Sequence, residues 1–381
     1  MEALGFLENF GSTAIGYVVP FLFVLTIVVF FHELGHFLAA RRCGVGVKVF
    51  SVGFGPELVG FNDRKGTRWR LSMVPLGGYV RFVGDENEAS QTDARALAEM
   101  DEDERRRAFA TKSVGARAFI VAAGPIANFI LAIVIFAAIF SIYGRQVTTP
   151  RVDNVVAGSP AERAGFEAGD IIVEIDGQPI GDFSQLQRIV SISSDVALTF
   201  VVQRGEERVT LTATPERQEI TDRFGNKHRV GILGIQRNTT GADIKVETYS
   251  PIQAVGLAAS ETWFVTERTL SYLFAVVVGR ESADQLGGPL RVAEVSAQVA
   301  TIGFVALINL AAILSISIGL INLFPVPMLD GGHLLYFAVE AIRGRPLSEK
   351  AQDVGFRIGF AAVVMLMIFA TWNDIIHLSS L

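Results

Sequence analysis

The sequence contains a single cysteine, Cys43, among its 381 residues. One cysteine excludes an internal disulfide and a metal cluster built from several cysteines. Charged residues are also scarce, at 19% of the chain, which is low for a soluble protein of this size. Met1 to Thr13 contains no lysine or arginine, so the basic start of a standard signal peptide is missing. The sequence has no long basic stretch of the kind that would indicate a nucleic-acid partner.

Long apolar runs dominate what is present, and half of all residues are hydrophobic. A helix that crosses a bilayer needs roughly 20 apolar residues. Four runs meet that length, at about 16–40, 118–143, 301–324 and 358–376. They predict an α-helical membrane protein with four transmembrane helices and a soluble insert. The N-terminal membrane part is then 1–143, and the C-terminal membrane part is 301–381.

Basic residues indicate how these runs are oriented. No lysine or arginine precedes the first run or follows the fourth. Basic residues do flank the runs within the segments 41–117 and 325–357, at 41, 42, 48, 105–107, 112 and 117 and at 343, 345, 350 and 357. The positive-inside rule places these two segments in the cytoplasm. Both termini and the region 144–300 are therefore expected on the outer side.

Within the outer region, residues 151–235 have the pattern of an α+β module. Two short β-rich runs flank a helix that opens at Ser159-Pro160 and ends at Gly165. A connector at 236–300 follows, and its segment 254–279 has apolar residues at helical spacing, interrupted by Glu261, Glu267 and Arg268. We interpret this segment as an amphipathic helix on the outer membrane surface, with a fifth crossing as the alternative.

The stretch "HELGH" at 32–36 places ionisable side chains at the end of the first apolar run. On a helix His32 and His36 share one face, and Glu33 flanks them. This is the arrangement in which two histidines bind Zn²⁺ and the glutamate acts as general base. The alternative is helix packing, but buried ionisable groups in a membrane are costly and usually functional.

A third protein ligand is needed, and Asp330 is the best candidate. It follows the third run in a segment where Pro325 and Pro327 break the helix. With four spans, the ends of the first and third runs lie on the same membrane side, which favours Asp330. His333 is a rival ligand, and its alternative is an ordinary place on the next helix.

Together these residues resemble the site-2 protease family, and most closely its bacterial regulator-of-sigma-E protease type with a single PDZ domain. The matching motifs are "HELGH" at 32–36, "SVGFGP" at 51–56, "PLGGYVRF" at 75–82, "GPIAN" at 124–128, "ERAGFEAGD" at 162–170 and "NLFPVPMLDGG" at 322–332. The resemblance implies that His32, His36 and Asp330 hold zinc and that Glu33 is the catalytic residue. Enterobacterial members carry two PDZ domains, whereas this chain has room for one PDZ-like module at 151–235.

The resemblance also implies a function and a location. It implies intramembrane proteolysis of single-span proteins such as anti-sigma factors, and of signal-peptide remnants, in a stress response at the bacterial inner membrane. A PDZ-like module would gate substrate access or bind a chain end. Arg68 to Phe82 is interpreted as a β-hairpin, either membrane-associated and substrate-pairing through Gly77 and Gly78 or an ordinary cytoplasmic hairpin.

Asn322 is implied to hold the substrate backbone, with a helix cap as the alternative, whereas Asn128 is interpreted as a packing residue. Two other functions compete with proteolysis. One is a metal transporter, which usually shows repeated halves, and no repeat is visible here. The other is a catalytically inactive PDZ scaffold in the membrane, against which the intact set of His32, Glu33 and Asp330 argues.

Overall fold

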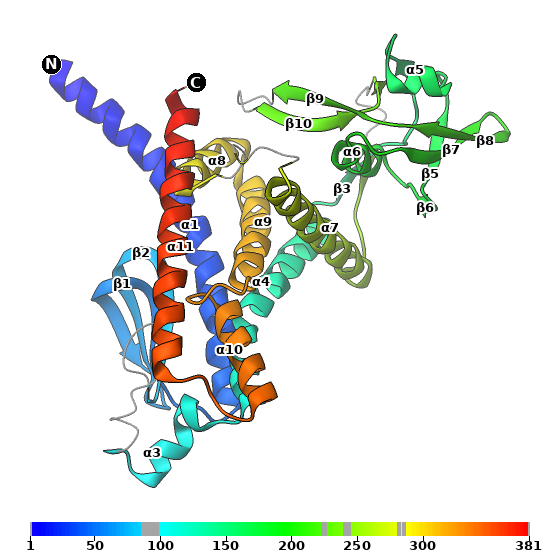
Figure 1. Ribbon diagram of the computed structural model, residues 1–381. Helices are drawn as coiled ribbons and strands as arrows, with labels where there is room; N and C mark the ends of the chain where they lie inside the picture. Colours follow the sequence, from blue (N-terminus) through cyan, green and yellow to red (C-terminus); the bar gives the residue numbers. More distant parts are fainter. Residues whose placement is uncertain are drawn as a thin grey trace. The chain divides into compact units, whose positions relative to one another are not determined.

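A computed structural model describes residues 2–84, 99–221, 227–238, 245–279, 283 and 287–379. The chain forms two compact units, which Figure 1 shows in the colours of the sequence. The first comprises Met1–Ala137 and Ala254–Leu381, and the second comprises Ala138–Gln253. All the residues expected to carry the chemistry belong to the first unit.

Among the described residues, four helices are long and apolar enough to cross a membrane, which confirms the predicted number of candidate spans. They are α1 (Glu2–Arg42), α4 (Val114–Ile142), α9 (Phe304–Asn322) and α11 (Glu349–Ser379). The fourth begins earlier than its apolar run, because the polar residues before that run are helical too. The third begins at Phe304 because Gly303, with a φ of 136°, separates it from the preceding helix.

Shorter helices complete the described part of the first unit. They are α3 (Glu102–Arg107), a single 3₁₀ turn at Phe109–Thr111, α8 (Pro289–Ile302) and α10 (Asp330–Arg343). The helix α7 (Pro251–Val277) covers most of the segment interpreted as amphipathic. Its position on or across the membrane stays a prediction. Residues 85–98 of the predicted cytoplasmic loop lie outside the described residues.

The strands β1 (Val47–Asn62) and β2 (Arg68–Phe82) form the sheet of this unit. The prediction of a hairpin within Arg68–Phe82 is wrong, because its two halves do not pair with each other. Phe50 pairs with Val80 on one side and with Trp69 on the other, so the middle of β1 lies between them. Alternation of apolar and polar residues predicts a strand, but it does not predict which strand it pairs with.

Glycines allow this arrangement of long strands. Gly53 and Gly55 have positive φ values of 90° and 85°, which bend β1 after Val52. The end of β1 then pairs with the first half of β2 from its other side, as the Phe61–Trp69 register shows. The spatial order of the four stretches is 78–82, 49–52, 68–72 and 57–62.

Aromatic side chains bind the sheet to α1, beside which it lies in Figure 1. Trp69 stacks on Phe50 with 4.2 Å between ring centroids and meets Phe37 of α1 edge-on at 4.9 Å. The turn between the strands is held by Asp63, which accepts hydrogen bonds from Trp69 Nε1 and from Arg41 at the end of α1. The sheet is therefore fixed to the helix that carries His32 and His36.

The second unit contains a four-stranded antiparallel sheet in the order β6-β5-β7-β8. These strands are Gln178–Pro179, Ile171–Ile175, Leu198–Arg204 and Glu207–Ala213. The helices α5 (Pro160–Ala164) and α6 (Phe183–Ile192) belong to the same unit. Its buried core includes Val152, Phe166, Ile172, Phe200 and Val202.

Three short strand pairs complete the second unit. They join β3 (Arg145–Val147) to β12 (Lys245–Glu247), β4 (Asn154–Val155) to β11 (Ile235–Gln236), and β9 (Glu216–Thr221) to β10 (Lys227–Ile232). The compact unit thus extends beyond the predicted module 151–235 at both ends. Its assignment as PDZ-like stays a prediction.

Candidate metal centre and active site

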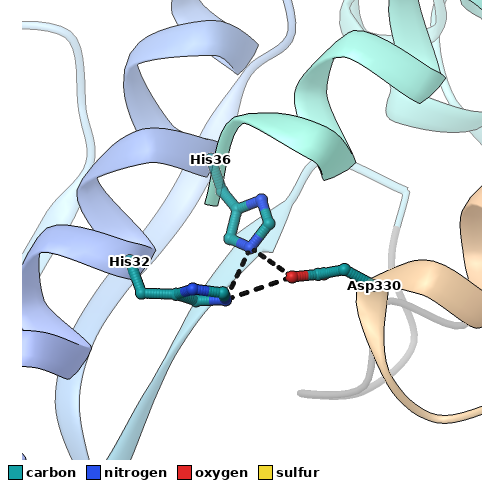
Figure 2. A group of neighbouring side chains, drawn as sticks. All are labelled: His32, His36 and Asp330. Atoms are coloured by element: carbon teal, nitrogen blue, oxygen red, sulfur yellow. Dashed lines mark hydrogen bonds and ion pairs between the residues drawn. The ribbon is translucent and has the colours of Figure 1, made fainter. Parts of the chain in front are cut away.

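Three side chains from two helices converge in the first unit, as Figure 2 shows. His32 and His36 lie one turn apart on α1, and Asp330 is the first residue of α10. Asp330 Oδ2 lies 3.1 Å from His32 Nε2 and 3.4 Å from His36 Nε2. The two Nε2 atoms are 3.2 Å apart. The structure therefore brings together the three residues expected to be ligands.

The spacing of these three atoms fits a tetrahedral zinc ion. With zinc–ligand bonds of about 2.0–2.1 Å, two ligand atoms of a tetrahedron lie about 3.3 Å apart. The three observed separations, between 3.1 and 3.4 Å, bracket that value. Two imidazole nitrogens and one carboxylate oxygen are also a donor set that zinc accepts.

Asp330 is positioned by the loop that separates α9 from α10. Pro325 and Pro327 keep this segment out of a helix, and Met328 has a strained φ of 130°. A Cβ on Gly331 would lie 2.2 Å from the carbonyl oxygen of Phe324, so only glycine fits the tight turn. Gly359 of α11 contacts the same loop so closely that a Cβ there would overlap Pro327. The prolines and glycines that follow the third span thus form a tight turn, which places the side chain of Asp330.

Residues of α4 contact the Nδ1 atoms of both histidine rings. His36 Nδ1 lies 2.9 Å from the carbonyl oxygen of Ile120. A Cβ on Gly124 would lie 2.2 Å from His36 Nε2, so this glycine makes room for the ring. Asn128, which sequence reasoning assigned to packing, lies with its amide 3.3 Å from His32 Nδ1. Gly124 and Asn128 both belong to the "GPIAN" motif, which was the only hint of them in the sequence. The periodicity and composition of that motif do not distinguish a functional site from a contact between helices.

A cavity of about 200 Å³ opens beside the three ligand candidates. Glu33, Asn322 and His333 line it, together with Gly78 and Tyr79 of β2. Gly78 approaches Glu33 closely, because a Cβ on Gly78 would lie 3.0 Å from Glu33 Cγ. Gly77 is not among the lining residues, and a Cβ there would meet the ring of Phe54 instead.

The two remaining candidates have different surroundings. Asn322 ends α9, and its Nδ2 donates a hydrogen bond of 3.1 Å to the carbonyl oxygen of Ile318. His333 lies one turn after Asp330 on α10 and faces the cavity, but it is not part of the converging group. Asn322 therefore has the local contact of a helix end and also a place in the cavity wall.

Comparison with known proteins identifies the family. The model of Peptidase family M50 matches residues 20–366. The chain belongs to peptidase family M50. A relative in Agrobacterium fabrum, named "putative zinc metalloprotease", is 51% identical over 375 residues, covering 98% of each chain. A Rhizobium meliloti protein of the same description is 51% identical over 360 residues, covering 94% of this chain and 96% of its own. Metalloprotease MmpA of Caulobacter vibrioides is 40% identical over 380 residues, covering 94% of this chain and 95% of its own.

Membership of M50 confirms the resemblance to site-2 proteases. The protein is a zinc metalloprotease of the membrane. This result favours the enzyme over the transporter and the inactive scaffold.

Proposed function

We propose that this M50 protease hydrolyses peptide bonds within or near the transmembrane segments of single-span membrane proteins. His32, His36 and Asp330 are the zinc ligands in this proposal, and Glu33 is the general base. The observation that carries it is the convergence of the three donor atoms, within 4.8 Å of one another, at the side of an apolar helix and beside a cavity that Glu33 lines.

The residues divide the chemistry between them. A zinc ion held by the three donors supplies Lewis-acid chemistry, which polarises a carbonyl and makes water more acidic. Glu33 follows His32 in α1 and lines the same cavity. Its carboxylate accepts the proton of the attacking water and passes it to the leaving amine.

The substrate binds as an extended strand in this proposal. A transmembrane helix hides its carbonyl groups in its own hydrogen bonds, so it must unwind before cleavage. Residues 78–82 of β2 pair with β1 on one side, and Gly78 and Tyr79 line the cavity. An unwound chain can add to the other edge of this stretch by β-augmentation. Gly78 and Asn322 are then the substrate contacts, and Gly77 contributes through the shape of the strand.

The proposal includes a location and a role for the insert. The distribution of basic residues favours outward termini, an outward insert and a metal centre towards the cytoplasm of the bacterial inner membrane. The module 151–235 acts as a PDZ-like gate that controls which substrates reach the site. Anti-sigma-like proteins and signal-peptide remnants are the expected substrates, in a stress response.

The ligand assignment is tested by measuring zinc in purified variants. His32→Ala, His36→Ala and Asp330→Ala should each lower bound zinc by at least tenfold, because structural and catalytic zinc sites need at least three protein ligands. His333→Ala is the matched control, since its ring lines the same cavity outside the donor group. Normal zinc in Asp330→Ala together with loss in His333→Ala would show that the third ligand is wrong.

A further inference from the structure

The two histidine rings receive different polar groups from α4. At His36, Nδ1 lies 2.9 Å from the carbonyl oxygen of Ile120. A carbonyl oxygen only accepts hydrogen bonds, so Nδ1 of His36 carries the proton. Its Nε2, which faces Asp330, then keeps the lone pair that a metal ligand needs.

The same condition applies to His32. Its Nε2 is the atom that faces Asp330 and His36. If Nε2 binds a metal, Nδ1 carries the proton and needs an acceptor. The group at Nδ1 is the side-chain amide of Asn128, which is 0% exposed.

A side-chain amide can present either of its ends to the ring, because the two ends have the same shape. With Nδ2 placed 3.3 Å from His32 Nδ1, the Oδ1 atom is buried without a hydrogen-bond partner among the described residues. Exchanging the two ends leaves Nδ2 in that unpartnered place, so burial does not choose between them. The proton on Nδ1 of His32 determines the orientation of the amide, because that proton needs the oxygen of Asn128 as its acceptor.

We propose that Asn128 is a positioning residue of the metal centre, whose Oδ1 accepts the Nδ1 proton of His32. This contact fixes the tautomer and the orientation of the ring, as ligand-orienting partners do in other metal sites. The proposal rests on the proposed function, because it takes His32 as a ligand. Asn128 would then be to His32 what the Ile120 carbonyl is to His36.

The backbone of Asn128 is held by α9. Ser315 Oγ donates a hydrogen bond of 2.9 Å to the carbonyl oxygen of Asn128. Gly319, one turn later on α9, approaches so closely that a Cβ there would lie 3.1 Å from Asn128 Cβ. Ser315 meets the backbone of Asn128 and Gly319 approaches its Cβ, so both contacts lie outside the side-chain amide that faces His32.

Packing alone does not account for an asparagine at this position. A buried amide that lacks part of its hydrogen bonds costs free energy, and more so in an apolar helix. Leucine has nearly the same shape and avoids this cost. In this proposal, the contact with His32 offsets the cost of burying the amide.

The test compares the zinc affinities of two Asn128 variants. A positioning role and a packing role predict opposite rankings of these two affinities. The full-length protein is purified in detergent, and its zinc affinity is measured by competition with a chelator. Asn128→Leu removes the acceptor and should weaken zinc binding by roughly 10- to 100-fold. Asn128→Asp keeps an oxygen at the same place and should bind zinc within about threefold of the parent protein, or more tightly. A packing role predicts the reverse order, because aspartate buries a charge and leucine does not.

Two further variants complete the experiment. Ser315→Ala removes the contact with the Asn128 backbone and should leave the zinc affinity within about threefold of the parent value. Asn128→Ala also removes the acceptor and should lose zinc affinity to the same extent as Asn128→Leu. Because alanine is smaller than leucine, this variant replaces Asn128→Leu in the test if the leucine variant does not fold. Thermal unfolding of the metal-free proteins shows which variants are folded.

Parent-like zinc affinity in Asn128→Leu and Asn128→Ala, or weaker binding in Asn128→Asp than in Asn128→Leu, would overturn the proposal. His32→Ala separates this result from a failure of the proposed function. If His32→Ala loses zinc while the apolar Asn128 variants keep it, only the role of Asn128 is wrong. If His32→Ala keeps zinc, the ligand assignment itself is wrong.

Discussion

At the scale of single residues, the absence of side chains next to the histidines is as important as the donors. Gly35 of α1 lies so close to α4 that a Cβ there would be 2.2 Å from the carbonyl oxygen of Ala123. Gly124 leaves the equivalent space on α4 for the ring of His36. The two helices can therefore approach until Ile120 and Asn128 reach the two rings.

Gly124→Ala tests this close approach. Its Cβ would lie 2.2 Å from His36 Nε2, so the ring must move and zinc affinity should fall at least tenfold. Gly115→Ala is the matched control on α4, since no atom lies within 4 Å of its Cβ. Chelator competition measures both affinities, and equal values for the two variants would refute the argument.

The residues of the site differ in how far the sequence predicts them. His32, Glu33 and His36 follow from a spacing of four on one helix, which is a local property. Asp330 follows from the direction of the odd-numbered spans, which hydropathy reveals. Asn128 contacts His32 across 96 positions, and an asparagine in an apolar helix is equally typical of packing, so only the three-dimensional structure places it at the ring.

At the scale of elements, the attachment of the β1–β2 sheet to α1 determines where the edge proposed to pair with substrate lies. Burial raises the pKa of Asp63, but hydrogen bonds from Trp69, from the backbone of Thr67 and Lys65, and from Arg41 outweigh it and lower the pKa to about 2. A lowered pKa means that the carboxylate is the form that stabilises the fold. This stabilisation is present above the ordinary carboxyl pKa of about 3.9 and is lost as the pH falls towards 2.

Asp63→Ala should loosen the sheet without removing zinc. Amide hydrogen exchange in β1 and β2 should become faster at neutral pH, while bound zinc stays at the parent level. Glu57→Gln is the control, because the Glu57–Arg68 ion pair joins β1 to β2 and is partly exposed. Unchanged exchange in Asp63→Ala would mean that aromatic packing alone holds the sheet.

The elements also show what periodicity cannot reveal. Alternation indicated strands between Arg68 and Phe82, but a 16-residue β1 that bends at two glycines can pair with both halves of β2. Pairing depends on contacts between distant residues, whereas alternation depends on neighbours. Helices are predicted more closely, because their hydrogen bonds lie within one segment.

At the scale of the whole molecule, the insert forms a compact unit whose two ends are joined by the pairing of β3 with β12. Lys245 pairs with Val147, so the chain enters and leaves this unit at one place. Hydropathy separates such an insert from the membrane part of the sequence. It does not predict the fold of the insert, because short alternating runs are compatible with many arrangements of strands.

Replacing residues 151–235 by a short Gly/Ser linker tests the proposed gate, and it leaves β3 and β12 in place. Cleavage of a substrate already trimmed on its outer side should remain within about threefold of the parent rate, because the proposed zinc ligands and Glu33 lie in the other unit. An untrimmed substrate with a folded outer domain should become cleavable. Loss of cleavage of the trimmed substrate, with zinc and folding intact, would instead indicate that the insert recruits substrates.

The central claim, that Glu33 catalyses zinc-dependent proteolysis of membrane segments, is tested most directly by one comparison. Purified parent protein and Glu33→Gln are loaded with zinc, and cleavage of a single-span substrate is followed in detergent or lipid. Glutamine is not expected to disturb the zinc ligands, so bound zinc should stay at the parent level while cleavage falls by roughly 10²- to 10⁴-fold. Undiminished cleavage by zinc-loaded Glu33→Gln would contradict the account.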